Sequence, residues 1–322
     1  MAAEGLGEFG RIRRFFAPLA GPGGLGLRDD AALVACAPGR QLVITVDAIV
    51  AGVHFLPDDP PDLVARKLLR VNLSDLAAMA AEPRHYLLTT ALPPGLDDGW
   101  VAAFANGLAA DQRRYGVALL GGDSVATSGP AVLSLTAIGE VAAGTEVRRS
   151  GARPGDRIWV SGTIGDGFLG LAVLRGSYPD LLPEHRARLI ERYRVPEPRT
   201  ELGPRLAGIA RAMCDVSDGL LADLGHICEA SGVAARVEAG RLPVSTASAA
   251  TGEATARLAS GGDDYELLFT AAAESTESVN RLAATLKLPI SPIGLIERGG
   301  GVRLIDENGE EIAVGNAGYR HF

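Results

Sequence analysis

Aspartates recur in this 322-residue sequence where an apolar segment ends beside Gly, Ser or Thr. They are Asp29, Asp30, Asp47, Asp75, Asp123, Asp215 and Asp218. Each one alone is equally well explained as a turn or cap residue. Carboxylates that converge from several segment ends repel one another unless cations lie between them. Their hard oxygens suit Mg²⁺, and with two or more Mg²⁺ ions such a group becomes a site for phosphoryl transfer.

The segment of residues 71–81 places one of these aspartates inside an apolar helix. Leu and Ala favour helix there, and neither Gly nor Pro interrupts it. We expect the segment to be buried, so Asn72, Ser74 and Asp75 need polar partners. One interpretation makes Asp75 the N-cap of a helix that begins there. The other makes it an Mg²⁺ ligand at a helix start, with Asn72 and Ser74 supporting it by hydrogen bonds.

Glycines beside the aspartates favour an anion-binding role. Gly121-Gly122 and Gly162-x-x-Gly165 allow backbone amides to approach a phosphate. No Walker A motif is present, because neither of the only lysines, Lys67 and Lys287, follows a glycine loop. Residues 21–26 match G-x-G-x-x-G, but no strand precedes them and a strand rather than a helix should follow. We therefore interpret them as a flexible turn and not as a dinucleotide site.

Three further side chains are weaker candidates. His54 lies seven residues beyond Asp47 and could touch a substrate, although a lone histidine is more often structural. Arg149 could bind a nucleotide phosphate with both guanidinium arms, although surface arginine is abundant here. Tyr319 could stack on a ring or could simply fix the C-terminal segment.

Composition narrows the class of protein. The formal net charge is -8 with no long basic run, which argues against nucleic acid as a partner. The three cysteines, Cys36, Cys214 and Cys228, form neither a disulfide framework nor a zinc motif. Neither a secretory signal nor an apolar run long enough for a membrane helix is visible. We expect a soluble, cytoplasmic protein that does not bind membranes.

Strands and helices alternate along the whole chain, which predicts an α/β or α+β fold. Strands are predicted at residues 31–35, 41–47, 85–92, 117–120, 131–141, 157–161, 214–217, 233–238 and 266–270, with edge strands at 293–297 and 302–306. Helices are predicted at residues 4–20, 62–81, 100–115, 202–212, 219–231 and 275–286. A loop over residues 162–167 should lead into a further helix that ends at about residue 174, and residues 179–204 should form loop and a short helix. Gly and Pro at residues 151–155 break the chain, and we place a domain boundary there.

The order of these motifs resembles one enzyme family. The strings Gly52-Val-His54-Phe55, Asn72-Leu-Ser-Asp75-Leu-Ala-Ala-Met79, Gly121-Gly-Asp-Ser124, Asp215-Val-Ser-Asp-Gly219 and Gly261-Gly-Asp-Asp-Tyr265 together resemble the thiamine-monophosphate kinase family. Single motifs are shared with aminoimidazole-ribonucleotide synthetase, selenophosphate synthetase and the hydrogenase-maturation dehydratase. The first two strings are more specific to the kinase.

The resemblance implies a two-domain, synthetase-like kinase fold. Residues 1–148 would form an ATP- and Mg²⁺-binding domain whose mixed sheet pairs with its copy in a homodimer. Residues 149–322 would form an α/β domain that closes over the active site. The enzyme would use ATP to phosphorylate thiamine phosphate to thiamine diphosphate, the final step of thiamine diphosphate biosynthesis.

The resemblance also implies a set of site residues, with several Mg²⁺ ions and ATP as co-substrate. The implied metal ligands are Asp30, Thr45, Val46 (through its backbone), Asp47, Asp75, Asp123, Asp215 and Asp218. The implied ATP contacts are Gly122, Asp123, Arg149 and Ser217, and the implied substrate contacts are His54, Asp263 and Tyr319. No side chain acts as a catalytic base, since Mg²⁺-assisted positioning would carry the reaction.

The chain departs from the family pattern at a few positions. Arg28 replaces a usual Gly, Asp166-Gly167-Phe168 replaces Asp-Ser-Ala, and Asp263 replaces a usual Glu. The residues after Ser124 also differ from the usual Thr-Thr-Arg-Gly. The alternatives are another ATP-dependent member of the superfamily, either an amidine-forming synthetase or a dehydratase, and a non-catalytic nucleotide or metal sensor.

Overall fold

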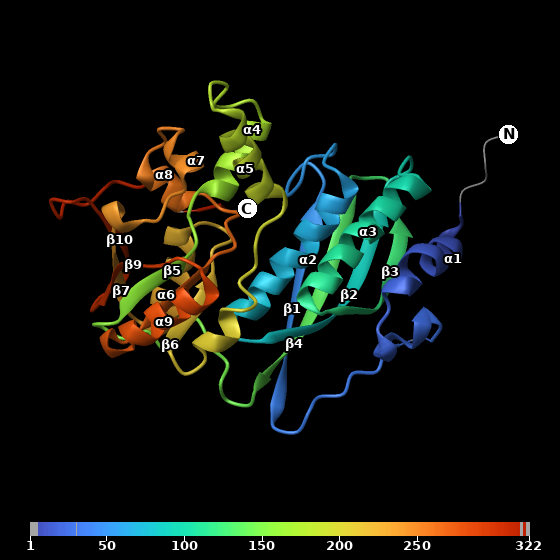
Figure 1. The fold of residues 1–322 in the computed structure, drawn as a ribbon, viewed down its shortest axis with the longest axis horizontal. Coiled ribbons are helices and arrows are strands. Elements are labelled where there is room, and N and C mark those ends of the chain that lie inside the picture. The colour runs from blue at the N-terminus through green and yellow to red at the C-terminus, as the bar shows by residue number, and fades with distance from the viewer. Residues whose placement is uncertain (1–5, 30, 316–317, 320–322) are drawn as a thin grey trace. The chain divides into compact units, whose positions relative to one another are not determined.

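The computed structural model describes residues 6–29, 31–315 and 318–319 (Figure 1). The chain folds as two compact units. The first unit comprises residues 1–76 and 81–143, and the second comprises residues 77–80 and 144–322. Each unit combines helices with a mixed sheet, so the α/β (α+β) class with two domains is confirmed.

The first unit contains, in its described residues, a four-stranded sheet ordered β1-β4-β2-β3. The strands are β1 (Arg40–Val50), β2 (Glu82–Leu92), β3 (Ala118–Ala126) and β4 (Val132–Ala142). β4 is antiparallel to both of its neighbours, whereas β2 and β3 are parallel. The helices α2 (Pro61–Ala78) and α3 (Asp98–Tyr115) cover one face of this sheet (Figure 1).

The two helices begin and end where their sequences dictate. In α3, Asp97 accepts the Trp100 N–H as an N-cap, and Gly116 takes the left-handed conformation after the last turn. α2 presents an unbroken apolar face, of which Leu68, Leu69 and Leu76 are fully buried. The helices predicted for residues 62–81 and 100–115 are therefore confirmed.

The N-terminal segment differs from its prediction. The helix expected at residues 4–20 is a succession of α1 (Glu8–Arg11), η1 (Ile12–Phe16) and η2 (Ala17–Leu19), and its first residues lie outside the described part. Phe16 is buried, but Phe9 is exposed. Residues 21–26 are not a flexible turn. They lie within η3 (Pro22–Leu27) or beside it and pack on β3, where a Cβ at Gly24 would lie 2.8 Å from the Leu120 carbonyl oxygen.

The strand predicted at residues 31–35 is wrong, since this segment has no strand pairing. A backbone hydrogen bond instead ties it to the N-terminal segment, with the Leu33 N–H donating to the Gly23 carbonyl oxygen over 2.9 Å. The prediction that Gly121-Gly122-Asp123-Ser124 follows a strand is also wrong, because this sequence lies inside β3.

The second unit contains, in its described residues, a six-stranded sheet ordered β10-β7-β9-β5-β8-β6. The strands are β5 (Arg157–Ser161), β6 (Ala210–Asp215), β7 (Ala234–Glu238), β8 (Leu267–Ala271), β9 (Ile290–Glu297) and β10 (Gly301–Ile305). Its longer helices are α4 (Asp166–Leu174), α5 (Pro183–Arg194), α6 (Leu220–Ser231) and α9 (Thr276–Leu286). The short ones are α7 (Thr246–Ala249), α8 (Thr255–Ser260), η4 (Gly203–Leu206), η5 (Ala239–Arg241) and η6 (Ala273–Ser275).

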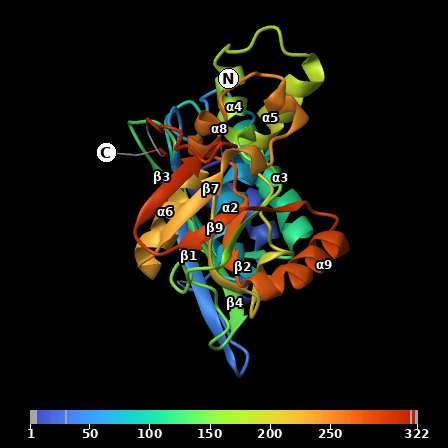
Figure 2. The ribbon, with the colours of Figure 1, turned by 90° about the vertical axis from the view of Figure 1, so that its left-hand side faces the viewer.

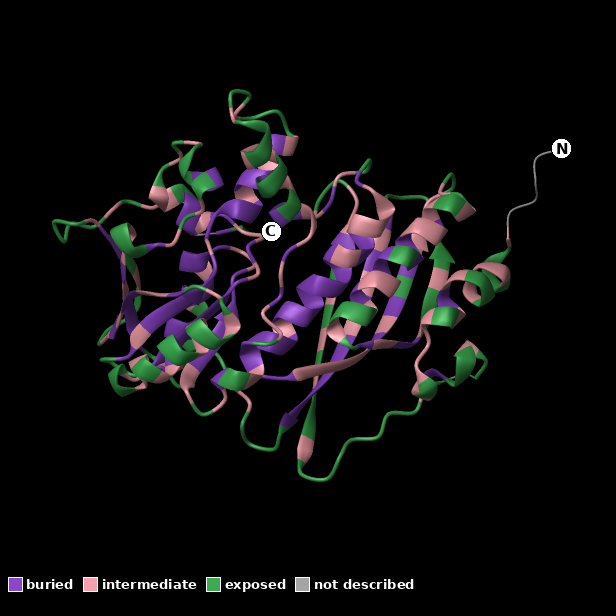
Figure 3. Cartoon of the chain, viewed as in Figure 1, coloured by how far each residue is buried: buried purple, intermediate pink, exposed green. Residues whose placement is uncertain are grey.

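Helices α6 and α9 lie on opposite sides of this sheet (Figure 2). Successive side chains of β5 point to opposite faces of the sheet. Ile158 and Val160 pack in the hydrophobic cluster with α6, and Trp159 packs in the cluster with α9. Both faces of the sheet therefore carry buried residues (Figure 3), and along β8 all five residues are buried.

Three predictions differ from the structure in this unit. The strand expected at residues 214–217 is β6 at Ala210–Asp215, so Val216 and Ser217 follow it as loop. The helix expected at residues 202–212 is only η4, because the chain from Ala210 onward pairs with β8 as β6. The strand at 293–297 is predicted at an edge, but β9 lies between β7 and β5, whereas β10 is an edge strand as predicted.

No helix in the described residues is long and apolar enough to cross a membrane. The three cysteines are free thiols, two of them buried.

Candidate functional site

Strand β1 and helix α2 bring three of the predicted ligands together. The Thr45 hydroxyl donates to Oδ2 of Asp75 over 2.7 Å. The backbone N–H of Asp47 donates to Oδ1 of Asn72 over 2.9 Å, and Asn72 is itself oriented by donating to the Leu68 carbonyl oxygen. Asn72 thus fixes β1 against α2 beside the contact between Thr45 and Asp75.

The position of Asp75 corrects both interpretations of its helix. α2 runs from Pro61 to Ala78, so Asp75 lies in its last turn and is neither an N-cap nor at a helix start. A carboxylate near a helix C-terminus gains nothing from the helix dipole. Its place is therefore explained by its partners rather than by capping. Val46, between Thr45 and Asp47, turns its side chain to solvent and can offer only backbone atoms to this junction.

His54 lies in the turn that follows β1. The Val50 N–H donates to its Nδ1 over 3.1 Å, which assigns the ring proton to Nε2. The carbonyl oxygen of His54 accepts a hydrogen bond from Nζ of Lys67 over 3.0 Å, and Lys67 is buried in α2. Sequence reasoning did not assign Lys67 a role, although it is one of only two lysines in the chain.

Gly122 and Asp123 line a cavity of about 570 Å³ in the first unit. Its walls come from β2, β3 and β4 and from the N-terminal segment that includes Asp29 and Ala31. Only glycine fits at position 122, because a Cβ there would lie 1.8 Å from the Leu88 carbonyl oxygen. Asp123 is exposed, and its Oδ1 accepts the Ser124 N–H. Asp30 lies outside the described residues.

The second unit has its own acidic loop between β6 and α6. Asp215 ends β6 and is buried, whereas Ser217 and Asp218 are partly exposed. Sequence reasoning missed Asp223, whose Oδ2 accepts the backbone N–H groups of Ser217, Asp218 and Gly219 at 3.1, 3.2 and 3.1 Å. Burial, with the Asp218 charge, raises the pKa of Asp223 to about 7, although the three N–H donors act in the opposite direction.

The segment that carries Asp263 pairs with this loop. The Asp263 N–H donates to the Ser217 carbonyl oxygen and the Tyr265 N–H to the Val216 carbonyl oxygen, both over 2.8 Å. Asp263 and Tyr265 have φ values of +68° and +52° in the left-handed region, which non-glycine residues rarely adopt. The surrounding contacts must therefore hold this conformation.

Two buried carboxylates provide those contacts. Asp264 accepts the N–H groups of Gly165 and Gly167 over 2.7 and 3.0 Å, and burial holds its pKa well above the ordinary value. Glu266 accepts hydrogen bonds from Ser161, Arg192 and Arg199 at 2.6, 3.0 and 2.6 Å. Asp264 belongs to the motif Gly261-Gly-Asp-Asp-Tyr265, but the motif does not indicate this network, because the partners of Asp264 and Glu266 lie far away along the chain.

Position 167 leaves no room for a side chain. A Cβ at Gly167 would lie 2.2 Å from the carbonyl oxygen of Asp263, so only glycine fits this backbone. Gly167 and Asp263 therefore pack directly against each other.

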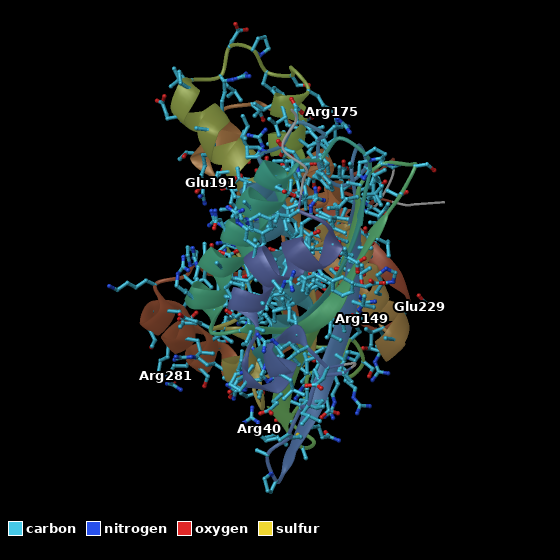
Figure 4. All side chains as sticks on the ribbon, turned by 90° about the vertical axis from the view of Figure 1, so that its right-hand side faces the viewer. Arg40, Arg149, Arg175, Glu191, Glu229 and Arg281 are labelled. Carbon is cyan, nitrogen blue, oxygen red and sulfur yellow. The ribbon has the colours of Figure 1, made fainter. Side chains whose placement is uncertain are left out.

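Tyr319 and Arg149 complete the predicted set. The Tyr319 N–H donates to the Asp218 carbonyl oxygen over 3.0 Å, and the residue borders a cavity of about 770 Å³ lined by α6 and β10. Arg149, labelled in Figure 4, is exposed and lies before β5. Burial raises the pKa of the Cys214 thiol near the end of β6, and the charge of Arg149 acts in the opposite direction. The Arg149 carbonyl oxygen accepts the Ser231 hydroxyl.

The predicted residues therefore fall into two groups, one per unit. In the described residues, no three His, Cys, Asp or Glu side chains form a preformed metal cluster. The donors are nonetheless hard oxygens with partly exposed carboxylates, which is the chemistry that suits Mg²⁺ and does not suit softer metals.

Comparison with known proteins gives the class first. The family described as AIR synthase related protein, N-terminal domain, matches residues 28–141, and its C-terminal domain counterpart matches residues 153–307. The two units, each with a mixed sheet and covering helices, are thus those of an AIR synthase related protein.

Individual relatives narrow the class. A thiamine-monophosphate kinase from Caulobacter vibrioides is 45% identical, over 98% of this chain and 90% of the relative. The crystal structure of thiamine-monophosphate kinase from Stenotrophomonas maltophilia K279a is 43% identical, covers 89% of this chain and 91% of its own, and has a TM-score of 0.82. AaThiL, solved in complex with AMPPCP and TMP, is 31% identical with a TM-score of 0.79, over 98% and 97% of the two chains. The chain belongs to the thiamine-monophosphate kinase family.

Proposed function

We propose that this chain transfers the terminal phosphoryl group of ATP to thiamine phosphate, forming thiamine diphosphate and ADP in thiamine biosynthesis. The observation that carries the proposal is the likeness to AaThiL, whose structure holds AMPPCP and TMP and which matches nearly the whole of this chain. AMPPCP is an analogue of a nucleoside triphosphate whose terminal phosphoryl group cannot be hydrolysed off. The kinase relatives at 39–45% identity support the same reaction.

The chemistry requires positioning more than proton transfer. A phosphate monoester is largely ionised at neutral pH, so its oxygen can attack the terminal phosphorus without a strong general base. A bond forms between that oxygen and the phosphorus while the bond to the ADP oxygen breaks. The protein must hold the two anionic substrates close together and in line.

We propose that Mg²⁺ ions offset the charge of those substrates. Thr45, Asp47, Asp75, Asp123, Asp215, Asp218 and Asp30, with the backbone of Val46, would hold the ions. When bound, Mg²⁺ would neutralise negative charge on the phosphate oxygens. Support comes from the hard oxygen atoms that meet where Thr45 bonds to Asp75 and from the partly exposed Asp218.

The remaining predicted residues would bind the organic parts and phosphates of the substrates. Gly122, Asp123, Arg149 and Ser217 would contact ATP, since Gly122 and Asp123 line the 570 Å³ cavity and Arg149 is exposed. His54, Asp263 and Tyr319 would contact thiamine phosphate. His54 would donate from Nε2, because its Nδ1 already accepts the Val50 N–H.

A product assay tests the proposed reaction. With ATP, Mg²⁺ and thiamine phosphate, the purified protein should form ADP and thiamine diphosphate in equal amounts, measured by chromatography. The control is the rate at which ADP forms from ATP when thiamine phosphate is left out. Consumption of ATP only in the presence of an aminoimidazole precursor would refute the kinase and favour a synthetase. Nucleotide binding with no turnover of any acceptor would favour a sensor.

We also propose that the first unit forms a homodimer through β1. This strand lies at the sheet edge, and its outward residues Leu42, Ile44 and Val46 are 39%, 61% and 60% exposed. An exposed apolar edge strand is a ready surface for pairing with another chain.

Replacing one of these apolar residues with a charge tests the dimer. Ile44→Glu should convert the protein from a dimer to a monomer in sedimentation equilibrium, because a carboxylate would be buried unpaired in the interface. Leu182→Glu, which changes an exposed apolar residue of the second unit, should leave the mass unchanged. A monomeric parent protein, or an Ile44→Glu variant that remains dimeric, would contradict this interface.

The last part of the proposed function is the cellular compartment. ATP is a cytoplasmic substrate, and the free thiols of Cys36, Cys214 and Cys228 suit a reducing compartment. We propose that the enzyme acts in the cytoplasm.

A further inference from the structure

The backbone of the loop that joins β6 to α6 makes an unusually complete set of internal hydrogen bonds. The carbonyl oxygens of Val216, Ser217 and Asp218 accept the N–H groups of Tyr265, Asp263 and Tyr319. Since buried backbone groups must find partners, these bonds fix one side of the loop.

The other side of the same loop closes on a single carboxylate. The N–H groups of Ser217, Asp218 and Gly219 all donate to Oδ2 of Asp223, in the first turn of α6. The Asp223 N–H in turn donates to the Gly219 carbonyl oxygen over 2.9 Å. Asp223 is 3% exposed, so it is shielded from bulk solvent.

This arrangement decides what the loop can offer to a ligand. Three convergent N–H groups before a helix are ordinarily a seat for a phosphate. Here the carboxylate of Asp223 accepts these N–H groups in place of a phosphate. The groups of the loop left for a ligand are therefore the side chains of Ser217 and Asp218, which are partly exposed.

We propose that Asp223 is a positioning residue, which holds the Ser217–Gly219 backbone so that the Asp218 carboxylate is presented to Mg²⁺. This inference rests on the proposed function, in which Asp218 binds the ion. Asp223 itself touches neither metal nor substrate. It replaces the anion that the loop would otherwise need in order to keep its shape, and so preorganises the site before any ligand arrives.

Metal binding without substrate tests this role separately from the kinase reaction. Mn²⁺ would serve as the probe in titration calorimetry on the full chain, with hydrogen exchange of the loop amides measured in parallel. Asp223→Ala should weaken Mn²⁺ binding at one or more sites by about tenfold or more, a typical loss for residues that support metal ligands. It should also speed exchange of the Ser217–Gly219 amides. Asp223→Asn should lose less, because its amide oxygen still accepts N–H donors.

Asp156→Asn is the matched control. Asp156 is also buried in the second unit, and it accepts the Arg153 N–H and a bond from Arg211, away from this loop. This variant should lower the melting temperature without changing Mn²⁺ affinity. The proposal would be overturned if Asp223→Ala bound Mn²⁺ as tightly as the parent protein. It would also be overturned if Asp156→Asn and Asp223→Asn weakened Mn²⁺ binding equally. If Asp223→Ala does not fold, the comparison of the two Asn variants decides. A parent protein without kinase activity would refute the proposed function and still allow this test.

Discussion

Asp75→Asn is expected to lower turnover by about 100-fold or more, because the variant loses a carboxylate that we propose as an Mg²⁺ ligand. The geometry separates this effect from folding. The Thr45 hydroxyl donates to Oδ2 of Asp75, and an asparagine side-chain oxygen can accept the same bond. The melting temperature should therefore stay close to that of the parent, since the hydrogen bond from Thr45 is kept.

Steady-state kinetics at increasing Mg²⁺ and thermal unfolding together check this expectation. Asp62→Asn, at the other end of α2, is the matched control and should keep parental turnover and stability. A fall of many degrees in the Asp75→Asn melting temperature would show that the carboxylate is structural. Parental turnover in the variant would remove Asp75 from the proposed ligands.

The elements that the sequence predicts well have strong local signals. α2 has no Gly and has Pro only at its first residue, and it keeps an apolar face along its length. α3 carries Asp97 before it and Gly116 after it, so both helices could be placed from their own residues. β5 matches its predicted range of residues 157–161 because Gly and Pro frame an apolar run.

The elements that failed depend on partners elsewhere in the chain. Ala210–Asp215 contains residues that favour helix and becomes β6 only because it pairs with β8. Residues 31–35 carry an apolar run typical of a strand, yet among the described residues they find no strand to pair with. Tertiary pairing outweighs local preference in both cases.

The candidate site divides in the same way. Aspartates beside glycines could be recognised from residue types, and the structure places Thr45 and Asp75 in contact. The residues that support them could not be found so easily. Asp223 looks like any acid in a first helical turn, and Glu266 meets Arg192 and Arg199 only after the fold brings together positions more than 60 residues apart.

Glu266→Gln should cause the largest loss of stability. Glu266 is fully buried, and its carboxylate pairs with the guanidinium groups of Arg192 and Arg199. Removing its charge leaves two arginines, one of them almost fully buried, without this counter-charge. Breaking a buried ion pair from one side costs about 3–5 kcal/mol in the free energy of unfolding. Because Glu266 also anchors the segment of Asp263, thiamine phosphate affinity should fall as well.

The two tryptophans make the measurement specific to one unit. Trp100 lies in α3 of the first unit, while Trp159 is buried in β5 of the second unit, stacked on Phe269 of β8. In a Trp100→Phe background, fluorescence during urea unfolding reports on the second unit alone, and Glu266→Gln should move that midpoint strongly downward.

Glu297→Gln is the matched control, since Glu297 also bridges two arginines but does so at the surface. It contacts Arg236 at 2.9 Å and Arg303 at 2.6 Å with a side chain that is 33% exposed. Exposed pairs are worth about 0–1 kcal/mol, so this variant should unfold nearly like the parent. The contrast follows from solvent access rather than from the number of ion pairs broken. Equal midpoints for the two variants would show that the Glu266 network adds no more stability than a surface bridge does.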